Sequence, residues 1–363
     1  MTVQPTVLPT ATYRVQLTSE FGFRHCALIL PYLSDLGIST LYCSPVLQAT
    51  FGSTHGYDTV DPTRLSTDLG GEEGWGMLLG AVRSCGMTLL LDIVPNHMAA
   101  TPANPWWRDV LEYGRLSPYA DYFDIDWEPP ERRLRNRVLL PVLPEPLHDI
   151  IADSRLSVAL AESGLVLRHG ELELPLDLRS YRHLLTPMLQ RPFGVETDEF
   201  VRLVRLVAAL HSVQELPATQ PSLLYDLRTG VKDKLLHLIL APQGAGHEEI
   251  ADAVRSAAEG LREDTLKRIL YEQHYVLEYW RSGRNHVNYR RFFEINDLVG
   301  VRVEDGRVFD ATHDLLRKLS ATEAVAGFRV DHIDGLRLPR RYLEQLRSLR
   351  TATAPGTSVR TPY

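Results

Sequence analysis

Apolar residues along the first hundred positions alternate between short continuous runs and repeats with helical spacing. The continuous runs predict strands at 11–17, 38–44 and 87–93. The helical repeats predict helices at 24–36 and 71–84, and a glycine follows each of them where a helix usually ends. Residues 45–70 are polar and contain glycine, which predicts a loop. This order of elements is typical of parallel strands joined by crossover helices.

The pattern changes after His97. Residues 98–310 are predicted to form a long, mostly helical insertion, with polar loops at 213–222 and 241–247. Helices are predicted within it at 197–211, 248–262 and 264–280. The alternation then resumes with a helix at 311–320, a strand at 324–330 and a helix at 341–349. The expected organisation is therefore a first segment at 1–97, an insertion domain at 98–310 and a continuation of the first fold at 311–363.

Composition narrows the class of protein. The chain has 363 residues, 44% of them apolar, and a net charge of −7, which argues against a general nucleic-acid binder. Cys26, Cys43 and Cys85 have neither metal-ligand spacing nor the even number of a disulfide framework, so we expect buried thiols in a reducing compartment. No secretory signal or membrane-spanning run is evident, and we expect a soluble cytoplasmic protein without membrane contact.

An arginine and a carboxylate stand two residues apart at the end of the strand at 324–330. Side chains two apart on a strand point to the same face, so the Arg329 guanidinium can lie beside the Asp331 carboxylate and keep it ionised. Active sites of parallel barrels form at the carboxyl ends of strands, which makes Asp331 a candidate nucleophile. The same pair also fits an aspartate that caps the next helix beside a structural arginine.

Two other strand ends carry polar side chains. Asp92 lies near the end of the strand at 87–93, and Asn96 and His97 follow it, where they could bind ring hydroxyls. Tyr57 and Asp58 lie in the loop after the strand at 38–44. Taken singly, His97 also fits a structural histidine, and the Tyr57–Asp58 segment also fits an ordinary turn.

Together and in this order, these segments resemble the α-amylase family of retaining glycosidases and transglycosylases. Further stretches are similar to its maltooligosyltrehalose synthase branch, namely 11–17, 44–45, 52–58, 92–98, 288–298 and 331–336. Hydrolytic α-amylases often have a Lys-His pair where this chain has Asp334 and Gly335, so the sequence departs from them toward the synthases. The similarity runs from about residue 11 to about residue 350.

The resemblance implies an α/β fold, a (β/α)8 TIM barrel of which the chain holds the first four strands, with the insertion after the third. It implies an isomerase that converts the reducing-end α-1,4 bond of a maltooligosaccharide into an α,α-1,1 bond by a retaining double displacement. Asp331 would form the glycosyl-enzyme intermediate, and Arg329 would keep it ionised.

Other roles follow from matching positions in that family. Tyr57 would stack on the sugar at the cleavage point, His97 and His332 would hydrogen-bond its hydroxyls, and Asp92 would support Arg329 from behind. Asp58 would orient its loop or bind sugar. Asn96, placed among the substrate-binding residues, matches a position that helps to bind calcium in many α-amylases.

The acceptor side of the site is expected to need walls that exclude water. Trp106, Trp107 and the run 289–293 are candidates for such a wall, although an aromatic cluster also fits a hydrophobic core. No metal motif completes a site around Asn96, so no metal and no cofactor are predicted. The implied substrate is a maltooligosaccharide or α-1,4-glucan, and a maltooligosyltrehalose trehalohydrolase is the implied pathway partner.

A retaining double displacement also needs a general acid, which in this family lies at the end of the fifth strand. Residues 351–363 contain no carboxylate side chain, so we expect this chain to lack the acid. Three hypotheses stay open: the N-terminal portion of a maltooligosyltrehalose synthase, a hydrolase of α-amylase type, or a truncated inactive chain that binds glucans or a partner.

Overall fold

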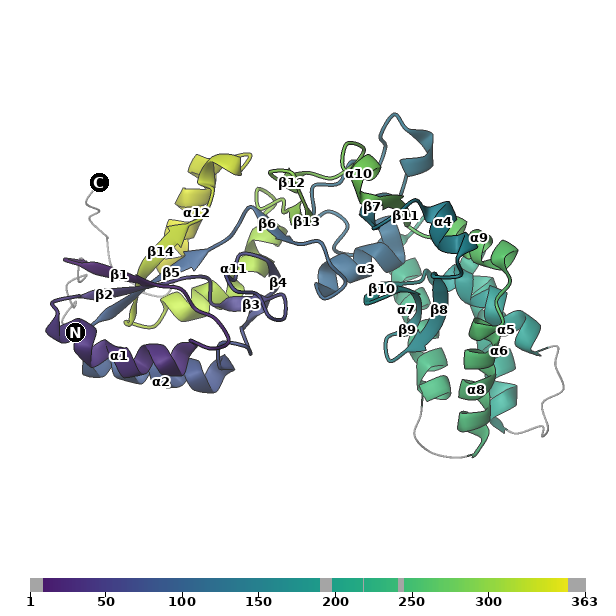
Figure 1. Cartoon of the computed structure of the whole chain (residues 1–363), viewed down its shortest axis with the longest axis horizontal. Helices are drawn as coiled ribbons and strands as arrows, with labels where there is room; N and C mark the ends of the chain where they lie inside the picture. The colour runs from purple at the N-terminus through teal and green to yellow at the C-terminus, as the bar shows by residue number, and fades with distance from the viewer. Residues whose placement is uncertain (1–8, 190–197, 218, 241–244, 352–363) are drawn as a thin grey trace. The chain divides into compact units, whose positions relative to one another are not determined.

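The computed structural model describes residues 9–189, 198–217, 219–240 and 245–351, and it divides into two compact units (Figure 1). The first unit contains the described residues of 1–104, 122–124 and 291–363. The second contains those of 105–121 and 125–290. Residues 291–310, which the sequence placed in the insertion, therefore belong to the first unit, as do 98–104.

The first unit is built on a parallel sheet whose strands lie in the order β1-β2-β5-β14 in the described part of the chain. These strands are β1 (Thr12–Val15), β2 (Thr40–Cys43), β5 (Thr88–Ile93) and β14 (Val325–Val330). The helices that connect or follow them are α1 (Phe23–Asp35), α2 (Gly71–Ser84), α11 (Gly306–Ser320) and α12 (Pro339–Thr351). The predicted alternation of strands and helices is confirmed, with element ends shifted by a few residues.

The core of this unit lies between the sheet and its helices. Leu41, Leu89 and Leu91 project from the strands and are fully buried, as are Leu30 of α1 and Leu78 of α2. Burial on both faces explains why the strand at 88–93 is a nearly continuous apolar run. The sequence predicted α2 with its observed bounds, because glycines stand at both of its ends.

Small antiparallel sheets flank the carboxyl ends of these strands. The predicted loop at 45–70 is wrong in part, because it contains a hairpin of β3 (Leu47–Ala49) and β4 (Thr59–Leu65). A second sheet has the order β12-β13-β6 and joins β6 (His97–Ala99) to β12 (Arg291–Phe292) and β13 (Ile295–Gly300). Residues about 200 apart in the chain thus meet next to the end of β5.

The second unit combines helices with two small sheets. Its strands are β7 (Val138–Leu143), β8 (Ser157–Ala161), β9 (Gly164–His169), β10 (Leu172–Pro175) and β11 (Tyr275–Tyr279). Its helices are α3 (Pro105–Tyr113), α4 (Leu147–Ala152), α5 (Arg182–Leu189), α6 (Asp198–Gln214), α7 (Pro221–Leu240), α8 (Ala245–Glu259), α9 (Glu263–Glu272) and α10 (Trp280–Gly283). Short 3-10 turns lie at 114–116, 132–134 and 178–181, and a further one in the first unit at 333–335.

The structure corrects two predictions in this unit. The predicted helix at 264–280 is α9 followed by β11, because Gln273 turns the chain and Tyr275 enters a parallel pair with β7. The predicted polar loop at 213–222 is shorter, because α6 reaches Gln214 and α7 begins at Pro221. The predicted helices near 197–211 and 248–262 are confirmed as α6 and α8. The insertion is therefore less purely helical than predicted.

The fold class is α/β and contains a parallel sheet. Closure of that sheet into a (β/α)8 barrel stays a prediction. No helix in the described part of the chain is long and apolar enough to cross a bilayer. Cys26 and Cys43 are buried and Cys85 is half-buried, and all three are free thiols.

His313 offers a pH-dependent test of the packing between α11 and α12. Its side chain is buried, with Nδ1 2.9 Å from the Phe309 carbonyl and Nε2 2.8 Å from the Tyr342 hydroxyl. Burial disfavours the imidazolium and lowers the pKa of His313 from 6.5 to about 4. Between these values the unfolded chain binds the proton more tightly than the folded chain. The contribution of His313 to the free energy of unfolding is therefore fully present above pH 6.5 and is lost as the pH falls toward 4.

We therefore predict that His313 makes the free energy of unfolding about 3 kcal/mol smaller at pH 4 than at pH 7. Urea unfolding of the wild type and of His313→Gln at both pH values measures this, because the variant lacks the titrating group. Equal losses of stability in the two proteins would contradict the prediction.

Candidate active site

The parallel register of β14 on β5 brings Arg329 directly opposite Asp92. Arg329 Nη1 donates to Asp92 Oδ1 at 2.9 Å and also to Asp331 Oδ1. Asp92 and Asp331 are 1% and 7% exposed, so both carboxylates are held largely out of water. Burial opposes the charge of Arg329, but hydrogen bonds and charges from the two carboxylates outweigh it and raise the pKa of Arg329.

Two tyrosines complete the surroundings of Asp92. The Tyr57 hydroxyl donates to Asp92 Oδ2 at 2.6 Å, and the Tyr42 hydroxyl donates to the same oxygen at 3.0 Å. Burial, together with the hydrogen bond to Asp92, raises the pKa of Tyr57 to about 12. Arg14 reaches the Tyr57 hydroxyl at 3.3 Å from the neighbouring strand β1. Tyr57 is therefore anchored as a neutral donor above the Arg329 ion pairs.

A cavity of about 580 Å³ lies at this end of the sheet. Five residues predicted from the sequence line it, namely Tyr57, Asp58, His97, Asp331 and His332. His55, from the same loop as Tyr57, also lines it. The backbone N–H of Asp331 donates to the Ile93 carbonyl at 2.9 Å, which fixes the nucleophile candidate just beyond the strand pairing. The structure thus brings together residues from three separate segments that the sequence predicted to share one site.

Phe292 connects the two candidate histidines. Its ring stacks on His97 with centroids 4.0 Å apart and meets the His332 ring edge-to-face at 4.7 Å. His97 Nε2 also lies 3.1 Å from the Tyr57 carbonyl oxygen. These contacts limit the motion of both imidazoles and tie the end of β5 to the end of β14.

Two residues beside the cavity have left-handed backbone. His332 has φ 44° and Phe293 has φ 52°, and their rings meet at 5.2 Å. This conformation is costly for bulky side chains and recurs at functional sites, where surrounding contacts hold it. Phe293 is 69% exposed, so burial of its own side chain does not explain its position.

The remaining predicted residues have structural partners. Asp58 accepts from the Ser53 hydroxyl at 2.6 Å within its loop, and it also lines the cavity. Asn96 is buried, its carbonyl accepts from Val301 N–H at 2.9 Å, and a Cβ on Gly335 would lie only 3.1 Å from its Oδ1. Glycine at 335 thus permits the close approach of the 3-10 turn to Asn96. Among the described residues, no group of three or more His, Cys, Asp or Glu side chains could hold a metal ion.

The structure divides the predicted aromatic wall. Trp106, Trp107 and Tyr289 are buried, and Trp107 packs edge-to-face on Tyr289 in the second unit, so these three belong to a core. Only the end of the run, Phe292, lines the cavity, with Phe293 next to it.

Sequence reasoning missed several lining residues. Ile295, Asp297 and Leu298 of β13 line the cavity, as do Thr50, Ala99 and Thr101. Burial raises the pKa of the Asp297 carboxyl. Residues 295–298 lie inside the stretch 288–298, which carried part of the family resemblance. That resemblance was the sequence signal that could have placed them at the site.

The sequence and the fold both have known relatives. Residues 27–155 match the family model described as α-amylase, catalytic domain. Over 346 residues, 93% of its length, the chain is 35% identical to a Mycobacterium tuberculosis protein that carries the name maltooligosyl trehalose synthase. The chain is a homologue of maltooligosyl trehalose synthase, in the α-amylase family.

Solved structures agree with this placement. The maltooligosyltrehalose synthase from Arthrobacter ramosus superposes with a TM-score of 0.63, at 34% identity, over 94% of this chain. A hypothetical maltooligosyl trehalose synthase from Sulfolobus tokodaii superposes with a TM-score of 0.64, at 25% identity, over 98% of this chain. This synthase homologue spans about a third of the length of the relatives it matches, 33% of the Mycobacterium protein and 34% of the Arthrobacter structure.

The buried Asp92 carboxylate gives a test of the site's electrostatics in this homologue. Asp92→Asn replaces one acceptor oxygen with an amide donor that faces the donors of Arg329 and Tyr57. We predict a decrease in the free energy of unfolding of about 2 to 3 kcal/mol, measured by urea denaturation. Asp334→Asn is the matched control, because the Asp334 side chain is 87% exposed, and should change stability by less than about 0.5 kcal/mol. Equal effects of the two substitutions would refute this account of Asp92.

Proposed function

We propose that this chain carries the nucleophile side of a maltooligosyltrehalose synthase active site. The observation that supports it is the placement of Asp331, a buried carboxylate paired with Arg329, in a cavity lined by Tyr57, His97 and His332. The reaction proposed is an intramolecular transfer that converts the reducing-end α-1,4 bond of a maltooligosaccharide into an α,α-1,1 bond.

The first step is attack by Asp331 on the anomeric carbon of the penultimate glucose. Because Arg329 holds Oδ1, the attacking atom is assigned to Oδ2. A bond forms between this oxygen and the anomeric carbon while the bond to the glycosidic oxygen breaks, and a general acid protonates the departing oxygen. Tyr57 stacks on the sugar, and His97, His332 and Asn96 are the proposed hydroxyl-binding residues, with Asp58 orienting its loop or binding sugar.

The second step returns the released glucose to the same carbon. Its anomeric hydroxyl attacks the glycosyl-enzyme, its proton passes to the conjugate base of the general acid, and the Asp331 carboxylate is regenerated. The relatives are about three times as long as the part that this chain spans, and the general acid is proposed to lie in the remainder. A trehalohydrolase that cleaves the terminal trehalose unit is the proposed next enzyme.

Transfer competes with hydrolysis, so the released glucose must be retained and water excluded. Phe292 and Phe293 are the proposed wall for this purpose. Their rings are 4.3 Å apart, and both contact His332, the residue that follows the nucleophile. The left-handed backbone at Phe293 orients an exposed aromatic ring beside the site.

The function is tested on the complete product of the gene with maltopentaose as substrate. The synthase should remove reducing ends without an equal release of glucose, whereas a rise in reducing ends would indicate an α-amylase-type hydrolase and contradict the proposal. Asp331→Asn should lower turnover by at least about a thousandfold, because the nucleophile is lost. Asp35→Asn, on the exposed end of α1, is the control and should keep wild-type turnover. Substantial turnover by Asp331→Asn would refute the nucleophile assignment.

The aromatic wall is tested by Phe293→Ala in the same protein. Loss of the ring should let water reach the intermediate, so the ratio of released glucose to transferred product should rise severalfold while maltopentaose is still consumed. Quantifying glucose and non-reducing product by chromatography gives this ratio. Leu28→Ala, which removes another exposed apolar side chain of the first unit, is the control. An unchanged ratio in Phe293→Ala would remove Phe293 from the proposed wall.

A further inference from the structure

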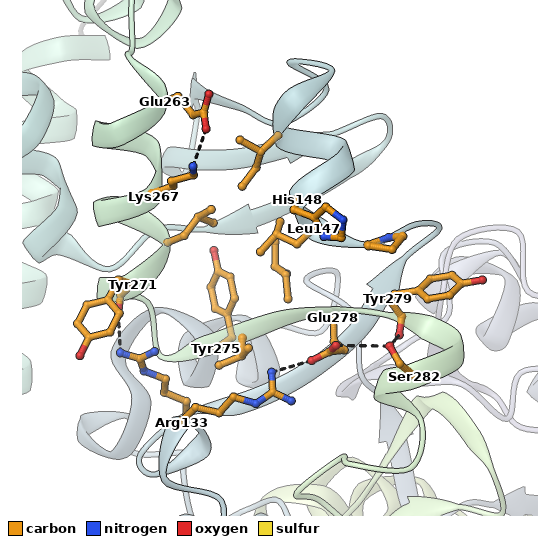
Figure 2. Close-up of a pocket in the computed structure, with 16 residues that line it drawn as sticks. Arg133, Leu147, His148, Glu263, Lys267, Tyr271, Tyr275, Glu278, Tyr279 and Ser282 are labelled. Atoms are coloured by element: carbon orange, nitrogen blue, oxygen red, sulfur yellow. Dashed lines mark hydrogen bonds and ion pairs between the residues drawn. The ribbon is translucent and has the colours of Figure 1, made fainter.

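The second unit contains a cavity of about 680 Å³ that shares no lining residue with the candidate active site (Figure 2). It lies among α4, α9, β11 and the segment 133–137. The volume falls within the range of about 300–1,000 Å³ that is usual for small-molecule sites. The function proposed above gives this cavity no role.

The interior of the cavity is apolar. Leu147 and Ile151 of α4 line it together with Leu270 of α9 and Val276 and Leu277 of β11. Apolar walls of this kind can pack against the C–H groups of a ligand as well as against an apolar side chain. Polar groups must therefore decide which ligand is preferred.

Two of the three Arg and Lys side chains that the structure describes at the cavity pair with carboxylates, and the third contacts Tyr271. Arg133 pairs with Glu278 at 2.7 Å, and Lys267 pairs with Glu263 at 2.6 Å, as the dashed lines in Figure 2 show. Arg137 lies over the Tyr271 ring at 4.8 Å and donates to the Tyr271 carbonyl. A charged ligand would have to compete with these pairs, whereas a neutral ligand with many hydroxyls could bond to their remaining donors and acceptors.

Tyrosines stand at the two ends of the cavity. Figure 2 shows Tyr271 at one end and Tyr279 at the other, with Arg133 and Glu278 between them. Tyr271 is 74% exposed, and because Arg137 lies over one face of its ring, only the other face is available for stacking. Separated aromatic rings with paired hydrogen-bonding groups between them suit a linear ligand of several pyranose rings, each with an apolar face and a polar rim.

We propose that this cavity is a second binding site, for a neutral oligosaccharide. The assignment of that oligosaccharide as an α-linked glucan rests on the proposed function. A glucan bound in this cavity would stay on the protein independently of its contacts with the residues around Asp331. An apolar peptide is the alternative ligand that the apolar interior would admit, and it would not require the two tyrosines and the paired charges together.

Hydrogen–deuterium exchange of the complete gene product with and without maltohexaose tests the proposal, because it reports each site separately. Binding should protect backbone amides in 263–282. Tyr271→Ala and Tyr279→Ala should each weaken this protection, with the half-saturating concentration raised about five- to tenfold, the effect of one stacked ring. Tyr271→Phe keeps the ring and should bind like the wild type. Tyr32→Ala removes a similarly exposed tyrosine from α1 and should have no effect.

The outcomes separate this inference from the proposed function. Absence of protection in 263–282, or protection that both alanine variants leave unchanged, would overturn the second site. Protection in 263–282 without protection in 329–335 would support the second site and contradict the proposed function. Circular dichroism of each variant shows whether a loss of protection comes from unfolding, and the binding of Tyr271→Phe identifies stacking as the cause.

Discussion

The guanidinium of Arg329 is the constraint on which the candidate site depends. It compensates two carboxylates, Asp92 and Asp331, which are both buried, and a buried charge without a partner is costly. The arrangement exists only in one register, with Arg329 opposite Asp92 on the neighbouring parallel strand. A shift by one residue would move Arg329 and Asp331 to the other face of the sheet. The hydrophobic pattern that sets the strand register therefore also sets the electrostatics of the site.

The surroundings of this ion triad follow from its burial. Tyr57 and Tyr42 supply neutral donors to the oxygen of Asp92 that accepts the weaker bond from Arg329, and Phe292 packs on the histidines nearby. These groups cover Asp92, which is 1% exposed, without adding charge, whereas the Arg329 side chain itself is 42% exposed. The left-handed residues His332 and Phe293 are tolerated at the rim because aromatic contacts hold them.

Much of the first unit could be predicted from the sequence because its signals are local. The strand at 88–93 is an apolar run that ends in Asp92, and α2 is bounded by glycines, so neither needs tertiary information. The pairing of Arg329 with Asp92 was also predicted, since strand periodicity fixes the face and the family resemblance supplies the partner. Residues whose chemistry depends on a strand end are the ones that sequence patterns locate best.

The missed features depend on contacts distant in sequence. β11 has a helical apolar pattern and becomes a strand only because β7, more than 130 residues earlier, offers an edge for parallel pairing. The hairpin of β3 and β4 lies in a polar, glycine-containing stretch. Its buried side chains do not alternate regularly, so the pattern does not indicate strands. Likewise, the buried Trp107 and the cavity-lining Phe292 have equal aromatic character in the sequence, and only their packing distinguishes a core residue from a site residue. Aromatic residues are therefore the least informative part of the sequence pattern, although one of them, Phe292, contacts both candidate histidines of the site.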